Sequence, residues 1–409
     1  MPLTTHRTFA FTGVAATFGA FFLAAGAPTP LLSLRQEQWG FTPGVLTVAF
    51  SAYAIALLAA LLVAGSLSDH VGRRPVILGA LAGETVSMVM FLLAPSIGWV
   101  VALRVVQGLA TGLGTTAFSA AIVEHAPPHL KKLAGGLTAA SVAGGLGLGA
   151  LLTGAAIRLT PAANTVVFGV LTALMVLALL FVMLTPETGT RRPGARRSLI
   201  PNVTVPTRAR SEFWAGIPVH VAAWMFPAFF LGLSPAVLRL QFGLDDGLVV
   251  GFTAFVGPFA ASVAGFAFAR YDARRGILAG LTMVVLGMAV VLAGVLASAL
   301  PIVWIGAVIG GAGFGGTFGG QIRLLSPHAG PHERAGLFSA VYTVAYLSFG
   351  VPVVVAGLLA PHWGLIPTFE TYAAAVIVLA LVGVAMQANR AIRTRQDLAR
   401  EAGVVPTIA

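Results

Sequence analysis

The sequence predicts an all-α, polytopic membrane protein in which twelve transmembrane helices form two pseudo-symmetric bundles of six. Composition is the first reason, because 57% of the 409 residues are hydrophobic and only 9% are charged, whereas soluble domains carry about 25% charged residues. The second reason is that apolar runs recur along the chain, many of them near the roughly 20 residues that a helix needs to cross a bilayer. The third is that the basic residues lie almost entirely on one side of these runs.

Each predicted span is an apolar run that ends at a short connection containing Pro, Gly or charged residues. The first run has the basic start and small-residue end of a secretory signal peptide, but it continues through Leu34 and so reaches spanning length. Six spans precede a long polar stretch and six follow it. The predicted spans are residues 8–34, 43–66, 75–95, 98–122, 133–158, 162–184, 212–238, 247–269, 276–297, 301–322, 336–359 and 366–388.

These spans divide the chain into four regions. An N-terminal six-helix bundle covers residues 1–184, and a C-terminal six-helix bundle covers residues 212–388. Residues 185–211 hold four prolines and six arginines without periodicity, which is typical of a flexible linker. Residues 389–409 form a polar tail.

The two halves also carry a weak internal similarity. Residues 127–149 and residues 331–350 both run from a turn with Pro and His through charged residues into a helix rich in small residues. Each segment lies between the fourth and fifth span of its half. This similarity indicates an internal duplication of the kind found in transporters.

The basic residues give the predicted orientation. Of the 24 Lys and Arg residues, 20 lie on the side that holds both termini and the linker, three lie on the other side, and Arg104 lies inside a span. Because basic residues are enriched in cytoplasmic loops, both termini and the linker are expected to be cytoplasmic. We therefore expect a multi-pass protein of the plasma (inner) membrane, embedded in the lipid bilayer. The net charge of +11 then reflects topology, and no nucleic-acid partner is expected.

The sequence excludes several kinds of chemistry. No cysteine is present, so disulfides and thiolate metal sites are ruled out. Residues 311–316 match GxGxxG, but they lie within an apolar run and follow no strand, so no nucleotide site is predicted. No P-loop, paired acids or Ser/His/Asp set is found. We therefore expect no metal, no cofactor and no enzymatic activity, and no use of ATP as an energy source.

A charged loop follows the second predicted span. Glycine in such a loop permits a turn or a close helix approach, and the carboxylate of Asp69 can pair with Arg73 or with the positive end of a helix. The residues stand in the pattern GxLxDxxGRR and are Gly65, Leu67, Asp69, Gly72, Arg73 and Arg74.

This pattern resembles the signature loop of the major facilitator superfamily, at the same place in the chain. The twelve spans, the long linker and the expected cytoplasmic ends are similar to that family over the whole chain, although His70 replaces the usual third basic residue. The resemblance implies that the loop docks against the start of the eleventh span, near Ala335, when the cytoplasmic side is closed. Asp69 would then be a latch that biases one of two global states. The alternative is that Arg73 and Arg74 only anchor the topology.

Two formal charges, Glu84 and Arg104, lie well inside predicted spans. Charge inside a membrane costs at least about 2.5 to 3.5 kcal/mol, so each is a candidate for function. Arg104 begins the segment RVVQG, which resembles the family's RxxQG element; Gln107 lies one turn away, and Gly108 and Gly112 let a neighbouring helix come close. A role in substrate or proton coupling is the first hypothesis for Arg104, and a purely structural pairing is the alternative.

The coupling proton has three candidate carriers. Glu84 is the first, and the alternative is an acid that is simply protonated or hydrogen-bonded to Thr85 or Ser87. Asp69 and His220 are the others. A histidine titrates near neutrality when it is wetted, whereas a lone histidine in a helix is commonly just hydrogen-bonded. The first span carries no carboxylate, unlike several proton-coupled drug exporters of the family.

Glycines in the fifth predicted span indicate close helix packing. Gly145, Gly149 and Gly154 resemble the exporter signature of this family at that span, although Ala150 and Thr153 depart from it. The signature favours efflux. Ordinary packing of small residues is the alternative.

The resemblance implies one substrate cavity between the halves, lined by the first, fourth, seventh and tenth spans. An aromatic lining with few charges favours a lipophilic or amphiphilic cargo, which is anionic or hydroxylated if Arg104 faces the cavity. Besides Arg104, Gln107 and His220, the expected lining residues are Thr17, Phe21, Trp224, Phe226, Phe314 and Thr317.

The predicted function is secondary transport of a small molecule by alternating access. Proton-coupled efflux of a drug or metabolite, by a chain that acts as a monomer, is the first hypothesis. Proton-coupled uptake or facilitated diffusion of a metabolite is the alternative. A transport-inactive membrane sensor is a further hypothesis from another class of protein.

Overall fold

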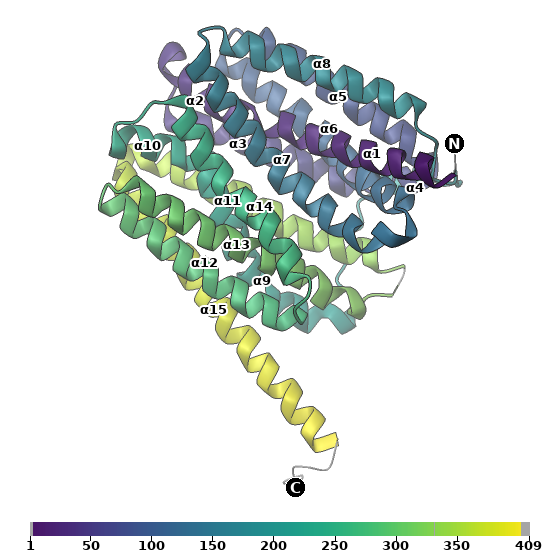
Figure 1. The fold of residues 1–409 in the computed structure, drawn as a ribbon. Coiled ribbons are helices and arrows are strands. Elements are labelled where there is room, and N and C mark those ends of the chain that lie inside the picture. The colour runs from purple at the N-terminus through teal and green to yellow at the C-terminus, as the bar shows by residue number, and fades with distance from the viewer. Residues whose placement is uncertain (1–2, 331, 402–409) are drawn as a thin grey trace.

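The computed structural model describes residues 3–330 and 332–401, and all regular structure in these residues is helical. Twelve of the helical segments in the described part are long and apolar enough to cross a membrane. The predicted all-α fold with twelve spans is therefore confirmed. The labelled helices (Figure 1) are α1 Leu3–Gly26, α2 Pro28–Trp39, α3 Pro43–Ala64, α4 Ser68–Val71, α5 Arg73–Leu92, α6 Ile97–His125, α7 Lys131–Leu159, α8 Ala163–Leu184, α9 Thr207–Ala228, α10 Ser234–Phe242, α11 Gly247–Phe268, α12 Ala273–Leu296, α13 Leu300–Leu325, α14 Arg334–Trp363 and α15 Leu365–Glu401.

The first and seventh spans are each built from two helices in series. The first span passes from α1 to α2 at Ala27, directly before Pro28. The seventh passes from α9 to α10 through a π-helical turn at Phe229–Leu233, and Pro227 precedes that turn. Proline has no N–H and clashes with the carbonyl four residues earlier, so it interrupts a helix at these points. Interrupted helices at matching positions of two halves point to a binding site between them.

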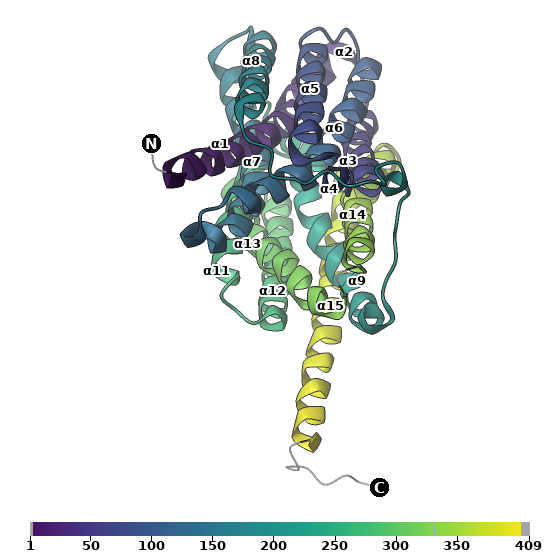
Figure 2. The ribbon, with the colours of Figure 1, turned by 90° about the vertical axis from the view of Figure 1, so that its right-hand side faces the viewer.

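The helices form two halves that lie side by side (Figures 1 and 2). Helices α1 to α8 make one half and α9 to α15 the other. Two helices of the N-terminal half pack closely against the C-terminal half: α3 packs against α14, and α7 packs against α11. The interface between the halves is therefore made by these two helix pairs.

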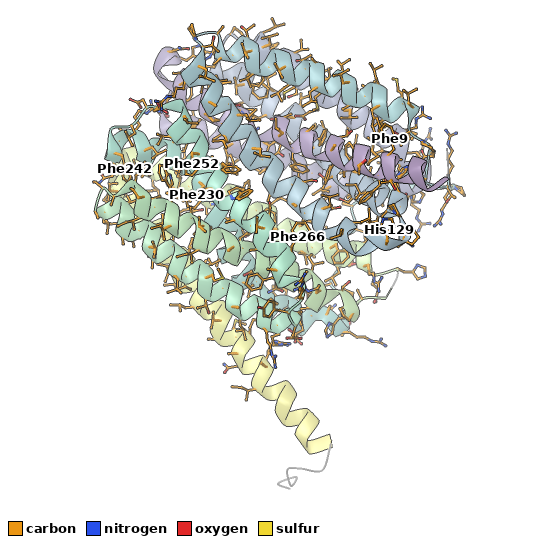
Figure 3. All side chains as sticks on the ribbon, in the orientation of Figure 1. Phe9, His129, Phe230, Phe242, Phe252 and Phe266 are labelled. Atoms are coloured by element: carbon orange, nitrogen blue, oxygen red, sulfur yellow. The ribbon has the colours of Figure 1, made fainter. Side chains whose placement is uncertain are left out.

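The outer surface of the bundle carries many large apolar side chains (Figure 3). Phe9, for example, is 67% exposed, and Leu184 is 87% exposed. In water such a surface would drive aggregation. It is the surface expected of helices whose outer face contacts lipid.

The two ends of the bundle differ in how the halves meet. We term the end at residues 40–42 and 243–246 the far end, and the opposite end, which holds α4 and residues 185–206, the linker end. At the far end Arg239 donates to Gln36 Oε1, and Arg158 Nη1 lies 3.2 Å from Asp246 Oδ2. Direct polar contacts thus close the far end.

The last helix runs past the bundle at the linker end (Figures 1 and 2). The apolar run of the twelfth span ends near residue 388, but α15 continues to Glu401. Arg, Ala, Gln and Leu, which have high helix propensity, make up most of this extension. The first part of the predicted tail is therefore helical, and residues 402–409 lie outside the described residues.

Candidate functional site

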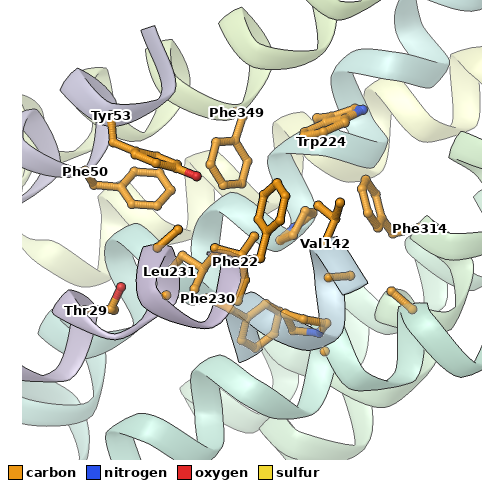
Figure 4. A pocket seen from close by; sticks show the side chains of 18 of the residues that line it. Phe22, Thr29, Phe50, Tyr53, Val142, Trp224, Phe230, Leu231, Phe314 and Phe349 are labelled. Atoms are coloured by element: carbon orange, nitrogen blue, oxygen red, sulfur yellow. The ribbon is translucent and has the colours of Figure 1, made fainter. Parts of the chain in front are cut away.

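A cavity lies between the two halves, next to the interruptions of the first and seventh spans (Figure 4). It encloses about 860 Å³ of space between atoms, part of it open to solvent. Nine of its lining residues are aromatic, and none of the described lining residues is acidic. The aromatic lining residues are Phe22, Phe50, Tyr53, Trp224, Phe226, Phe230, Phe314, Tyr346 and Phe349.

The structure brings four of the expected lining residues together in this cavity: Arg104, Trp224, Phe226 and Phe314. The other expected lining residues, which are Thr17, Phe21, Gln107, His220 and Thr317, do not line it. All five are buried within the halves.

Phe21 shows why one of these expectations is wrong. Phe21 packs against Phe118 of α6, with 5.5 Å between the ring centroids. Its neighbour Phe22 lines the cavity instead. Adjacent residues of a helix point about 100° apart, and the sequence of this uniformly apolar helix does not indicate which of the two faces the other half.

Four helices outside the expected spans contribute cavity residues, which are α3, α7, α11 and α14. Phe50 and Tyr53 come from α3, and Tyr346 and Phe349 come from α14. Helices α3 and α14 pack against each other across the two halves. A signal was available, because each pair is an aromatic doublet at i and i+3 within an apolar span.

Arg104 reaches the cavity from α6 and is held by the broken first span. Its Nη1 donates to the carbonyl oxygen of Ala25, at 3.3 Å, and its Nε donates to that of Ala49, at 3.4 Å. The Arg104 guanidinium lies 4.2 Å from the centre of the Tyr53 ring. Carbonyl groups in the last turn of a helix carry partial negative charge, so α1 offers a favourable site for this cation.

Gln107 links Arg104 to Glu84. The Gln107 Oε1 accepts from Arg104 Nη1 at 2.5 Å, while its Nε2 donates to Glu84 Oε1 at 2.9 Å and to the carbonyl of Ala24 at 3.2 Å. Pro28 has no N–H to offer the Ala24 carbonyl, which is why this acceptor is available to Gln107. The result is a buried chain of groups from α5 through α6 to the cavity.

Glu84 is completely buried on α5 at the closed end of this chain. Within the described residues its Oε2 has no hydrogen-bond partner. Neither of the hydroxyls considered as partners serves, because Thr85 donates to the Leu81 carbonyl and Ser87 Oγ is itself unpartnered there. A proton can therefore be held on Oε2 while Oε1 stays bonded to Gln107.

His220 is not part of this chain of groups. It is buried on α9, and its Nε2 has no hydrogen-bond partner among the described residues. Within residues 3–330 and 332–401 no carboxylate is bonded to it, and it does not line the cavity. Of these two buried titratable groups, therefore, it is Glu84 that is linked to Arg104 by hydrogen bonds.

Asp69 pairs within its own loop rather than with the second half. It accepts from Arg73 Nη1, and Arg73 Nη2 lies 3.1 Å from Glu124 Oε1 at the end of α6. Among the described residues no hydrogen bond or ion pair joins Asp69 to the start of α14, so the docking near Ala335 that was expected for a closed cytoplasmic side stays a prediction. Arg73 lies one helical turn from Asp69 and is the nearer partner.

The other loop residues have varied surroundings. Leu67 packs against the apolar core of the N-terminal half. Gly65 does not mediate the expected close approach of two helices, since its nearest neighbours are backbone atoms of Leu61 in the preceding turn. Gly72 has φ +103°, a conformation that glycine adopts readily. Arg74 donates to the Met183 carbonyl at the end of α8.

Part of the linker packs on this loop. Glu187 accepts hydrogen bonds from the backbone N–H of Arg73, at 2.9 Å, and of Arg74, at 3.0 Å. The first N–H groups of a helix need acceptors and favour a carboxylate, so Glu187 caps the start of α5. Arg192 N also donates to the His70 carbonyl at 2.8 Å. Polar capping of this kind leaves no periodic pattern in a sequence.

Gly72→Ala is expected to destabilise the capped loop. A Cβ at Gly72 would lie 2.5 Å from Glu187 Oε2, and the positive φ adds strain of about 1–3 kcal/mol. Gly194→Ala is the matched control, because Gly194 also has φ +103° but a Cβ there would meet nothing closer than 3.7 Å. Thermal unfolding in detergent should show a lower Tm for Gly72→Ala than for Gly194→Ala. Equal Tm values for the two variants would mean that the hydrogen bonds of Glu187 to the start of α5 contribute nothing to stability.

The predicted packing glycines all lie at close helix contacts. A Cβ at Gly108 or Gly112 would come within 2.3 Å of a carbonyl oxygen of α3. At Gly145 and Gly149 a Cβ would lie 2.7 and 2.0 Å from carbonyl oxygens of α1. At Gly154 it would lie 2.2 Å from the Gly247 carbonyl oxygen of α11. These glycines therefore fix α6 on α3, α7 on α1, and α7 on α11 across the two halves.

Gly154→Ala is expected to push α7 away from α11. The cost of such overpacking is about 1–3 kcal/mol, which should lower the Tm and slow transport. Gly135→Ala on the same helix is the control, since a Cβ at Gly135 would meet nothing within 4 Å. Thermal unfolding and transport by the two variants should be compared. A Gly154→Ala variant as stable and active as Gly135→Ala would contradict a tight contact between the halves.

Membrane transporters have these features: twelve spans in two halves, a central cavity, and hydrogen-bonded charged side chains buried beside it. The chain belongs to the Major Facilitator Superfamily, whose family model matches residues 10–351. It is therefore a multi-pass membrane transporter, as its sequence resemblance implied.

Comparison with individual proteins agrees with this family. The chain is 31% identical over 260 residues to the tetracycline resistance protein, class C, of Escherichia coli, a match that covers 59% of this chain and 62% of that relative. The match thus spans less than two thirds of the relative's length.

Solved structures share the fold. The human organic anion transporter MFSD10 (TETRAN) has a TM-score of 0.69 at 16% identity, with 94% of this chain and 100% of that chain covered. A peptide transporter, POT, has a TM-score of 0.74 at 15% identity, with 94% of each chain covered. At such identities the likeness concerns the fold alone.

Proposed function

We propose that this chain exports a small lipophilic or amphiphilic molecule across the membrane by alternating access, coupled to protons. The observation that carries the proposal is the aromatic cavity with Arg104 at its wall, connected through Gln107 to the buried carboxyl of Glu84. The cavity supplies a cargo site, and the carboxyl supplies a group that can gain and lose a proton. The cavity lies at the interface of the two halves, whose relative movement would expose it to either side.

The proposed direction of transport is based on the similarity to the tetracycline resistance protein. A membrane transporter can give resistance to a compound by exporting it, and the relative in Escherichia coli is named for resistance to tetracycline. The glycine contact between α7 and α11, at the position of the exporter signature, also supports export. Proton antiport is the coupling that we propose with it.

Uptake by proton symport is the second candidate, and the Gln107 bridge favours it. A proton on Glu84 removes the negative charge that offsets Arg104. A cargo with an acceptor group then binds Arg104 more tightly when Glu84 is protonated, and by reciprocity the cargo favours binding of the proton. Ligands that bind together can be carried together, as in symport.

Purified protein in liposomes with an imposed pH gradient separates these functions. An antiporter accumulates cargo in the acidic compartment, and a symporter accumulates it in the alkaline compartment. Cargo that only equilibrates, whatever the gradient, would indicate a facilitator and contradict proton coupling. If no molecule from a broad panel of lipophilic dyes and drugs moved, the transport-inactive sensor would replace both proposals.

We also infer that the linker and both termini face the cytoplasm and that the membrane is the inner membrane. The uneven distribution of Lys and Arg supports this orientation. The cavity is complete within one chain, which supports a functional monomer. Because the chain has no cysteine, single cysteines at Ser198 and Ser298 can be labelled from one side of intact cells. If an impermeant reagent labelled Ser198→Cys from outside the cell, the orientation would be the opposite of the one proposed.

A further inference from the structure

We infer that the preferred cargo is an aromatic molecule with an anionic acceptor group, such as a carboxylate, a phenolate or an enolate, and that the cavity disfavours lipophilic cations. This inference rests on the proposed function, in which the central cavity is the cargo site. It is carried by the hydrogen-bonding character of the groups that line the cavity.

Two polar side chains of the cavity wall, Arg104 and Trp224, can donate but not accept. A guanidinium and an indole N–H have no acceptor atom, whereas a tyrosine hydroxyl can do both. Among the described residues, Tyr53 Oη and Trp224 Nε1 are buried without a hydrogen-bond partner. Both residues line the cavity (Figure 4). Arg104 lines it as well. Neither Tyr53 Oη nor Trp224 Nε1 is exposed on the cavity wall, so Arg104 carries the contact with an anionic cargo.

Arg104 has donors left over after all its contacts with the protein. Its Nε and Nη1 bond to Ala49, Ala25 and Gln107, which uses three of its five N–H groups. Its Nη2 makes no hydrogen bond within the part of the chain that the structure describes. An arginine holds a carboxylate with two parallel bonds or with one charge-assisted bond. The free Nη2 is therefore the predicted contact for the anionic group of the cargo.

The same geometry disfavours a cation. No described lining residue is acidic, and the nearest carboxyl in the chain of groups, Glu84, is separated from the cavity by Gln107. A cation in the cavity would meet the charge of Arg104 across a medium of low dielectric constant. Aromatic faces can attract cations, but Arg104 already occupies a face of Tyr53.

The rest of the wall suits a flat ring. Trp224 contacts Phe314 and Phe349 edge to face, with ring centroids 5.3 and 5.8 Å apart. Tyr346 lies against the same indole, at 5.2 Å. Offset and edge-to-face contacts of this kind extend readily to an aromatic ligand. The cargo therefore places its ring among these side chains and its acceptor toward Arg104.

Binding of three probes of equal size tests the inference. Naphthoate, naphthamide and naphthylmethylammonium share one ring and differ in charge, and their affinity for the purified protein in detergent can be measured by quenching of Trp fluorescence and by thermal shift. Naphthoate is expected to bind at least about tenfold more tightly than the cation, with the neutral amide between them. Equal or tighter binding of the cation would overturn the inference.

One variant and one control locate the effect. Arg104→Gln should remove the preference for naphthoate over naphthamide, while Arg275→Gln, an exposed site away from the cavity, should keep it. If Arg104→Gln does not fold, the probe series on the unaltered protein still decides. An unchanged preference in a folded Arg104→Gln protein would contradict the role of Arg104.

This test is independent of the transport test. Binding in detergent involves no gradient, so a preference for anions can hold even if the proposed export fails. Conversely, gradient-driven movement of a lipophilic cation in liposomes would support the proposed transport and overturn the cargo class.

Discussion

Replacing Glu84 by Gln is expected to abolish the response of transport to a pH gradient while cargo binding survives. Glutamine keeps an oxygen that can accept from Gln107 Nε2, as Glu84 Oε1 does at 2.9 Å, but it cannot gain or lose a proton. Cargo should then equilibrate across the membrane without accumulating on either side. The measurement is accumulation in liposomes with and without an imposed pH gradient.

Glu370→Gln is the control for this experiment. Glu370 is an exposed acid on α15, outside the cavity, so its replacement should leave gradient-driven accumulation unchanged. The Glu84→Gln protein should also bind acceptor-bearing cargo with little dependence on pH. Full gradient-driven accumulation by Glu84→Gln would move the proton site elsewhere in the chain.

Replacing Arg104 is expected to have the other large effect. Arg104→Ala removes the cation from the cavity wall. Hydrogen bonds to charged groups contribute about 1.5–3 kcal/mol, so cargo affinity should fall about 10- to 150-fold, at about 1.4 kcal/mol per factor of ten. Arg104→Lys keeps the charge but lacks the planar fork, so its loss should be smaller.

The two substitutions also separate binding from folding. Arg104→Ala leaves the carbonyl groups of Ala25 and Ala49 without the donor that they share, which is expected to lower stability by about 1–3 kcal/mol. Arg275→Ala should change neither stability nor transport. Cargo affinity and Tm are measured on the same purified samples. A folded Arg104→Ala protein that binds cargo normally would show that Arg104 is only structural.

The spans could be predicted from the sequence because lipid imposes a simple requirement. An apolar helix of about 20 residues satisfies its own backbone and faces hydrocarbon, and composition alone reveals it. The interruptions at Pro28 and Pro227 change the shape of two spans without changing their hydropathy. They are visible as prolines, but the π-helical turn after Pro227 depends on packing against the neighbouring helices.

The site was predictable only where charge made it visible. Arg104 and Glu84 stand out because ionisable groups are rare within spans, but nothing in their spacing shows that Gln107 joins them. The aromatic residues of the wall sit in uniformly apolar helices, where one face resembles another. Phe21 and Phe22 illustrate this: the interface with the other half, which a local pattern does not encode, selects Phe22.

The contacts of the loop that holds Asp69 and Arg73 could not be predicted, for a different reason. Asp69 could pair locally with Arg73 or at long range with α14, and both arrangements agree with the same sequence. Glu187 lies 114 residues from Arg73 and caps α5 from a segment with no periodicity. Long-range polar contacts of single residues leave no signature in one sequence.

The contact of Gly154 with Gly247 and Gly251 has a mechanical consequence. Side chains of packed helices interlock, so one helix turns on another only when those side chains change rotamers. Backbones that meet through glycine have nothing to interlock. Under the proposed alternating access, we therefore expect the two halves to pivot about this contact while polar pairs such as Arg158 and Asp246 at the far end separate.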